Sequence, residues 1–371
     1  MEKIICGDCL EVLKDMESES VNCVMTSPPY WALRDYGTAQ WKGGDEKCDH
    51  KIDVQPRIER KKQGLTGGLE YMKSQEPIYK DICGKCGAKR IDQQLGLEPT
   101  FQEYINSLCD IFDEVKRALR KDGTCWVNMG DSYMPHGGSR GNKTSAGADS
   151  LRKNYDMEEI APKHKRDMSG LKAKCLCQIP SRFAIEMTNR GWILRNELIW
   201  YKPNCMPSSV KDRFTVDFEK IFFFTKKKKY WFETQYEPHE WLEKEKRRKN
   251  FYKKVSYNSK YSNGVGATQR FTENARSERY NKEGRNKRCV WKINTKPYAK
   301  AHFAAFPEKL VETPIKAGCP KGGTVLDPFS GAGTTGVVAK KLGRNFIGIE
   351  LNPEYVKMSE DRIANTQRSM F

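Results

Sequence analysis

The chain has 371 residues, 37% hydrophobic and 31% charged, which is enough for one large domain or two to three smaller ones. It has no apolar run of the roughly 18 residues that span a bilayer, and its first residues lack the layout of a signal peptide, so we expect a cytoplasmic protein without a membrane partner. The net charge of +18 favours a nucleic-acid partner over a merely soluble basic protein, because phosphate neutralisation and counterion release supply most sequence-independent DNA affinity.

The amino-terminal segment predicts two short buried strands, at 4–5 and 21–25, with a helical turn at 10–16 between them. The second strand runs directly into Ser27-Pro28-Pro29. Two consecutive prolines cannot continue a central strand, so the strand must end there and its carboxyl end must open into a loop. Ligands bind at this edge of open α/β sheets.

Residues 41–94 lack a sustained hydrophobic period and are predicted to form an insertion. Thirteen cysteines without a secretion signal indicate reduced thiols or metal ligands rather than a disulfide framework. Within the insertion, Cys83-Gly84-Lys85-Cys86-Gly87 has the C-x-x-C-G spacing of a zinc knuckle, and Cys48-Asp49-His50 offers two more ligands. We expect a structural zinc ion, which stabilises the insertion or helps it to grip DNA, with free surface thiols as the alternative; the expected ligands are Cys48, His50, Cys83 and Cys86.

Residues 99–119 predict an amphipathic helix that Thr100 can cap. After a turn at Asp122-Gly123, residues 124–129 predict a buried strand that ends at the same edge of the sheet as the Ser-Pro-Pro loop. Residues 135–174 are rich in Gly, Ser, Lys and Arg and are expected to be mobile until a partner binds. Further predicted elements are a helix at 179–190 and strands at 192–201 and 219–225.

Residues 226–294 are strongly basic and aromatic without a clean period, beginning with Lys226-Lys227-Lys228-Lys229-Tyr230-Trp231-Phe232. Lysine and arginine contact phosphates, while arginine and amide side chains read base edges. The segment therefore predicts a nucleic-acid-binding region, with a solvated charged face as the alternative.

The carboxyl-terminal part predicts a helix at 302–316, followed by a strand at 324–326, a helix at 337–341 and a strand at 346–350. Asp327 ends the first strand, and glycines in the loop after it let a ligand approach the backbone, where the start of the next helix offers free N–H groups. At the end of the following strand, the carboxylate of Glu350 can accept hydrogen bonds from both hydroxyls of a ribose.

Two other nucleotide-binding classes are disfavoured. A phosphate-binding ATPase would need a Gly-Lys-Ser/Thr ending after the glycine-rich loop, which is absent. The G-x-G-x-x-G spacing of a dinucleotide dehydrogenase is present in Gly331–Gly336, but such an enzyme has no role for a Ser-Pro-Pro-Tyr loop.

Together, Thr26-Ser27-Pro28-Pro29-Tyr30-Trp31 and Asp327-Pro328-Phe329-Ser330-Gly331-Ala332-Gly333-Thr334-Thr335-Gly336 resemble the motifs of DNA amino-methyltransferases that use S-adenosylmethionine. Their order is that of the β arrangement, in which the catalytic motif precedes the cofactor motif. The resemblance implies a Rossmann-like α/β methyltransferase fold with a mostly parallel seven-stranded sheet, S-adenosylmethionine as cofactor and double-stranded DNA as substrate. It divides the chain into a catalytic-loop part at 1–40, the zinc-binding insertion at 41–94, the continued methyltransferase domain at 95–225, a target-recognition region at 226–294 and a cofactor-binding part at 295–371.

The resemblance also implies roles for residues of the catalytic loop. Ser27 offers its hydroxyl and Pro28 its carbonyl to the amino group of the target base. Tyr30 offers a stacking face, and Pro29 helps to keep the loop rigid. Trp31 either adds to this pocket or belongs to the core.

In the cofactor half, the resemblance assigns Asp8 to the adenine amino group, with a mere helix cap as the alternative. It assigns Glu350 to the ribose, and Phe306, in the segment 302–307, to the methionine end, with a core position as the alternative. The other cofactor residues are expected in the glycine-rich loop: Asp327, Pro328, Phe329, Ser330, Gly331, Gly333 and Thr334.

An exocyclic amino group is a poor nucleophile because its lone pair is delocalised into the base. Oxygens that accept its hydrogens turn that lone pair toward the methyl donor, and the base must be flipped out of the duplex. Methylation at cytosine C5 is disfavoured because the chain has no Pro-Cys dipeptide. Serine at the first position of the loop favours cytosine N4. The alternatives are adenine N6, a catalytically inactive DNA-binding module, and methylation of RNA or protein; a cognate restriction endonuclease and the oligomeric state stay open.

Overall fold

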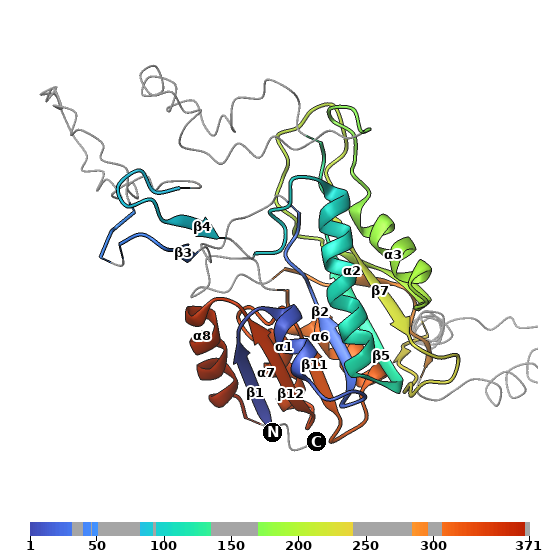
Figure 1. Cartoon of the computed structure of the whole chain (residues 1–371). Coiled ribbons are helices and arrows are strands. Elements are labelled where there is room, and N and C mark those ends of the chain that lie inside the picture. The colour runs from blue at the N-terminus through green and yellow to red at the C-terminus, as the bar shows by residue number, and fades with distance from the viewer. Residues whose placement is uncertain are drawn as a thin grey trace, which may run out of the picture.

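An eight-stranded sheet forms the centre of the computed structural model, which describes residues 1–31, 40–45, 47–50, 82–91, 94–134, 170–239, 284–295 and 306–367 (Figure 1). In spatial order the strands are β1 (Glu2–Cys6), β12 (Asn345–Glu350), β11 (Thr324–Asp327), β2 (Val21–Thr26), β5 (Leu119–Met129), β7 (Phe218–Thr225), β6 (Ile193–Tyr201) and β10 (Val290–Lys292). Strand β7 runs antiparallel to β5 and β6, and the other neighbours are parallel. The mostly parallel α/β architecture is confirmed, with one strand more than the seven expected.

Two local features differ from expectation. The additional strand β10 lies in the segment predicted to be basic and irregular, and only Trp291 of its three residues is buried. So short a strand leaves no apolar run for a sequence pattern to detect. The turn predicted at Asp122-Gly123 is an irregularity within β5, where the register against β2 shifts.

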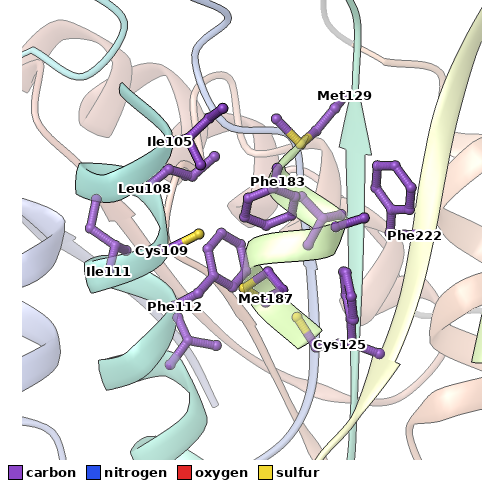
Figure 2. Close-up of a cluster of buried hydrophobic side chains, with 14 of the residues drawn as sticks. Ile105, Leu108, Cys109, Ile111, Phe112, Cys125, Met129, Phe183, Met187 and Phe222 are labelled. Carbon is purple, nitrogen blue, oxygen red and sulfur yellow. The ribbon is translucent and has the colours of Figure 1, made fainter. Parts of the chain in front are cut away.

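Helices cover both faces of the sheet. In the strands, neighbouring side chains alternate between the faces, so Phe222 of β7 belongs to the first core and Phe223 to the second. Figure 2 shows the first core, where Phe112, Phe183 and Phe222 converge. The helices on this face are α1 (Cys9–Asp15), α2 (Phe101–Ala118) and α3 (Ile179–Asn189), and those on the other are α6 (Glu308–Gly318), α7 (Thr334–Lys341) and α8 (Pro353–Ala364).

Two small antiparallel pairs lie outside the main sheet: β3 (Gln40–Lys42) with β4 (Lys89–Ile91), and β8 (Tyr236–Glu237) with β9 (Arg285–Asn286). All thirteen cysteines are free thiols. Among the described helices, none has both the length and the apolar character needed to cross a bilayer. Most of the segment expected to be mobile, 135–169, lies outside the described residues.

The chain leaves the two central strands in opposite directions. From β11 it passes through α7 to β12 on one side, and from β2 it passes through α2 to β5 on the other. Such a switch point opens a crevice at the carboxyl ends of the strands, where open α/β proteins bind ligands. Thr26 ends β2 and Asp327 ends β11, so the two predicted loops start side by side.

A buried carboxylate connects these two loops. Asp327 is 0% exposed. Its Oδ1 accepts a hydrogen bond from Thr26 Oγ1 at 2.6 Å, and its Oδ2 accepts one from Thr335 Oγ1 at 2.6 Å. Burial raises the pKa of Asp327 to about 6, against the lowering effect of these hydrogen bonds. One side chain thus ties the end of β2 to the start of α7.

We expect Asp327 to make folding pH-dependent. With a pKa of about 6 when folded and of about 3.9 when unfolded, this carboxyl binds its proton more tightly in the folded state. Its contribution to stability is therefore complete below about pH 4 and is lost as the pH rises through about 6. The free energy of unfolding of the wild type, measured with urea, should fall relative to that of Asp327→Asn by on the order of 3 kcal/mol over this range. A difference that does not change with pH would contradict the assignment.

Candidate active site

Five polar side chains converge where the loop after β2 meets β5, β6 and β7. These five side chains, which we call the polar cluster, are those of Ser27, Tyr30, Asn128, Lys202 and Glu219. Because β7 is antiparallel, Glu219 near its start lies at the same edge as Asn128 near the end of β5 and Lys202 just after β6. Of the five, the sequence assigns a role only to Ser27 and Tyr30. It places the end of the strand that carries Asn128 at this edge, whereas Glu219 joins Asn128 and Lys202 through the direction of β7.

Glu219 is the centre of the polar cluster. Its Oε2 accepts hydrogen bonds from Tyr30 Oη and Asn128 Nδ2, both at 2.7 Å, and its Oε1 pairs with the ammonium of Lys202. Tyr30 Oη accepts in turn from Asn128 Nδ2 at 3.0 Å and from Ser27 Oγ at 3.4 Å. Burial and the charge of Glu219 raise the pKa of Tyr30 well above its ordinary value. The phenol therefore stays protonated and donates to Glu219.

The loop after β2 is fixed from the side of the core. Tyr104 Oη donates to the carbonyl of Pro29 at 2.8 Å, and Trp31 Nε1 donates to the carbonyl of Glu98 at 2.9 Å. Trp31 is 1% exposed and lies in the first core, so it belongs to the core rather than to a pocket. Pro28 is buried as well.

The ring of Tyr30 lies directly against the backbone of Gly130. A Cβ on Gly130 would come 2.5 Å from Cε2 of Tyr30, which no real contact allows. A side chain at position 130 would therefore push the ring away from its place, so Gly130 helps to set the position of the Tyr30 hydroxyl.

The carboxylate of Glu350 holds the glycine-rich loop. Its Oε2 accepts from the backbone N–H of Gly331 at 2.8 Å, and its Oε1 accepts from that of Asn352 at 2.9 Å. Burial raises the pKa of Glu350, although these hydrogen bonds lower it. Cys6, two residues before Asp8, lies opposite Glu350 on the neighbouring strand.

Asp8 has a structural partner too, because it caps α1. Its Oδ1 accepts from the N–H groups of Leu10 and Glu11 at 2.9 and 3.2 Å. The structure thus places Asp8 and Glu350 at the ends of adjacent strands, and each binds backbone N–H groups. Neither role excludes a ligand, since a carboxylate has about four lone-pair sites.

The glycine-rich loop leaves open space at Gly331. Gly331 and Gly333 have left-handed backbones, with φ of 50° and 73°. A Cβ on Gly333 would lie 2.6 Å from Cβ of Ser359, whereas no described atom lies within 4 Å of the Cβ position on Gly331. A ligand can therefore approach the backbone closely there. Of the other predicted cofactor residues in the loop, Phe329 packs against the first core and the buried ones are Asp327, Pro328, Ser330 and Thr334.

Phe306, predicted to contact the methionine end of the cofactor, lies just before α6 and packs against the second core. The preceding residues 302–305 of that segment lie outside the described residues.

Two of the buried polar atoms without a partner lie at the end of β5 and in the glycine-rich loop. Asn128 Oδ1 and Ser330 Oγ are buried and have no hydrogen-bond partner within the described part of the chain. Buried polar groups are nearly always hydrogen-bonded, because an unpaired one costs about 1–3 kcal/mol. Ligand atoms that supply the missing partners would lie against the polar cluster and the glycine-rich loop.

The loop from β6 to β7 lies at the same edge. Asn204 Nδ2 donates to the carbonyl of Thr295 at 3.1 Å, and the N–H of Thr295 donates to Asn204 Oδ1 at 2.9 Å. Beyond this anchor, Met206 and Phe214 are 88% and 96% exposed. The sequence gives no signal for two such apolar side chains in solvent near the polar cluster.

The described start of the basic segment lies at the opposite end of the sheet from the polar cluster. Lys226 Nζ donates to the carbonyl of Leu119 at the start of β5. The rings of Tyr230 and Phe232 pack on the ring of Phe223. Their centroids lie 5.6 Å and 5.7 Å, respectively, from that of Phe223. Residues 240–283 lie outside the described residues, so the recognition role of 226–294 stays a prediction.

The four predicted metal ligands also come together. One ligand atom from each of Cys48, His50, Cys83 and Cys86 lies within 4.8 Å of all the others. This cluster is separate from the polar cluster and the glycine-rich loop.

Known proteins resemble the chain over nearly its whole length. The family model described as DNA methylase (N6_N4_Mtase) matches residues 21–361. The Type II methyltransferase M.SmaI of Serratia marcescens is 35% identical over 97% of this chain and 90% of its own, and M.Cfr9I of Citrobacter freundii is 36% identical over 96% and 86%. The solved PvuII DNA methyltransferase (cytosine-N4-specific), 20% identical, shares the fold with a TM-score of 0.52 over 97% of this chain and 85% of its own. With both loops inside the matched region, the chain belongs to the N6_N4_Mtase family of DNA methylases.

Proposed function

We propose that this DNA methylase transfers the methyl group of S-adenosylmethionine to the exocyclic amino group of a base flipped out of double-stranded DNA, and that the product is N4-methylcytosine. The observation that best supports this proposal is the hydrogen bond from Thr26 to Asp327, which joins the end of β2, next to the polar cluster, to the start of the glycine-rich loop. We assign the methyltransferase domain to 1–40, 95–225 and 295–371, with 41–94 as an insertion and 226–294 as the target-recognition region.

The glycine-rich loop fits S-adenosylmethionine. Gly331 leaves space beside the backbone, and the hydroxyl of Ser330 is buried without a partner among the described residues. Glu350 can accept from the ribose hydroxyls and Asp8 from the adenine amino group. When bound, the cofactor supplies an electrophilic methyl group, and the electron pair of the broken bond stays on its sulfur.

The polar cluster orients the hydroxyl of Ser27. Since Tyr30 donates its phenolic hydrogen to Glu219, the lone pairs of Tyr30 Oη can accept a hydrogen bond from the Ser27 hydroxyl, at 3.4 Å. The Ser27 oxygen then presents its lone pairs to one hydrogen of the target amino group, and the Pro28 carbonyl accepts the other. This turns the nitrogen lone pair toward the methyl donor, so catalysis is by positioning and electrostatics.

The same contacts offer a route for the proton that the amino group loses on methylation. The hydroxyls of Ser27 and Tyr30 form a line that ends at the carboxylate of Glu219. Lys202 compensates the negative charge of Glu219 before the proton arrives.

The nature of the methylated base is tested by product analysis. We expect transfer of tritiated methyl from S-adenosylmethionine to duplex DNA, and digestion to nucleosides followed by mass spectrometry should give N4-methyldeoxycytidine. N6-methyldeoxyadenosine would overturn the cytosine assignment, which rests on the serine at position 27. Cofactor binding without transfer to DNA would identify an inactive DNA-binding module, and transfer only to RNA or protein would refute the DNA substrate.

Ser27→Ala and Tyr30→Ala should each lower kcat by about 100-fold or more, as losing a preorganised group does. The Kd of S-adenosylmethionine, measured by calorimetry, should stay within about twofold, because neither side chain belongs to the glycine-rich loop. Ser20→Ala, at the other end of β2, is the matched control and should leave both quantities unchanged. Turnover by Ser27→Ala at the wild-type rate would refute the role of the loop.

Glu219→Gln should reduce kcat about 10- to 100-fold, because an amide cannot accept from Tyr30, Asn128 and Lys202 together. Glu197→Gln is the control: Glu197 on β6 also pairs with a lysine, Lys220 at 2.8 Å, but takes no part in the polar cluster. Equal losses in both variants would show a general effect of removing an ion pair rather than a role in orientation.

A further inference from the structure

Four side chains of the insertion that are able to bind a metal lie close together. Cys48 and His50 follow β3, and Cys83 and Cys86 precede β4, so the antiparallel pairing of β3 with β4 brings both segments together. The cluster lies outside the site described above, and nothing in the methyl-transfer chemistry uses it. In Figure 1, β3 and β4 project to one side of the main sheet.

A tight turn presents the two thiols of the C-x-x-C segment. The N–H of Cys83 donates to the carbonyl of Ala88 at 2.8 Å, and the N–H of Gly87 donates back to the carbonyl of Cys83 at 2.8 Å. Gly87 has φ of 73°, a conformation that suits glycine. The backbone therefore forms the knuckle that the sequence spacing predicts.

Two of the distances between ligand atoms match those of a tetrahedral metal site, and all of the ligand atoms lie within 4.8 Å of one another. Cys48 Sγ lies 3.7 Å from Cys83 Sγ, and Cys86 Sγ lies 3.6 Å from His50 Nδ1. Around a tetrahedral zinc ion with Zn–S of about 2.3 Å and Zn–N of about 2.0–2.1 Å, neighbouring sulfurs are about 3.8 Å apart and sulfur and nitrogen about 3.6 Å apart. A disulfide would need about 2.0 Å between sulfurs, so this spacing suits thiols that share a metal.

The described part of the insertion has a small buried core. Among residues 41–45, 47–50 and 82–91, only Cys83 and Ala88 are buried. Trp41 stacks on the ring of His50 at 4.4 Å, and Lys85 pairs with Asp49 at 3.1 Å. Where few side chains are buried, as in these described segments, a metal ion adds stability that a hydrophobic core does not supply.

We propose that Cys48, His50, Cys83 and Cys86 bind one Zn²⁺ ion in a closed structural site. Thiolates and an imidazole in tetrahedral order favour zinc over hard cations, and four protein ligands leave no position for substrate. The ion joins residues 40–50 to residues 82–91.

The test measures metal rather than methyl transfer, so its result is independent of the proposed function. The full chain, purified without a metal-affinity column from cells supplied with zinc, should contain about one zinc per chain by plasma mass spectrometry. Cys86→Ser and His50→Ala should lose most of this zinc, while Cys289→Ser, which alters an exposed cysteine elsewhere, should retain it. Far-UV circular dichroism checks that the main domain is folded in each variant.

Replacement of zinc by Co²⁺ gives a second readout. The wild type should show the visible absorption of tetrahedral cobalt and the charge-transfer band of thiolate ligands, and Cys86→Ser should lose intensity in both. Wild-type protein without bound zinc, or equal zinc in the wild type and in folded Cys86→Ser and His50→Ala, would overturn the proposal.

Discussion

The hydrogen bonds of Asp327 hold the two halves of the site in place. Thr26 and Asp327 are 301 positions apart in the chain, yet they end adjacent parallel strands and share a hydrogen bond of 2.6 Å. Both carboxylate oxygens accept from hydroxyls in a fully buried position. Separating the loops would leave buried polar groups unpaired, so this side chain reinforces the placement of the polar cluster beside the glycine-rich loop that the pairing of β2 with β11 sets.

Three further acidic side chains around the site also accept hydrogen bonds from protein groups. Glu350 holds the backbone of the glycine-rich loop, Asp8 caps the helix after β1, and Glu219 collects the donors of the polar cluster. Each acid has protein partners before any ligand arrives. The site is thus preorganised, which reduces the reorganisation needed when charge develops during the reaction.

Features that depend on neighbouring residues in the chain, such as the ends of strands and the glycine-containing loops, can be predicted from the sequence. Pro28 and Pro29 end a strand, and glycines with left-handed backbones form the second loop, so both loops can be found without a structure. The sequence places the end of the strand that carries Asn128 at this edge, but Glu219 could not be found in this way, because its meeting with Asn128 and Lys202 depends on the antiparallel direction of β7. Likewise Trp31 has no local signal that separates a core position from a pocket, and only its tertiary contacts decide.

The direction of β7 also separates the first lysines of the basic segment from the target base. Glu219 is the second residue of the strand and Lys226 directly follows its end, so the two lie about 23 Å apart at about 3.3 Å per residue. Along a straight duplex, with about 3.4 Å per base pair, this distance corresponds to about seven base pairs. On the proposed function, and for a duplex that runs along β7, phosphates touched by Lys226 would thus lie well outside the immediate neighbours of the modified nucleotide, and side chains from other parts of the chain would contact those neighbours.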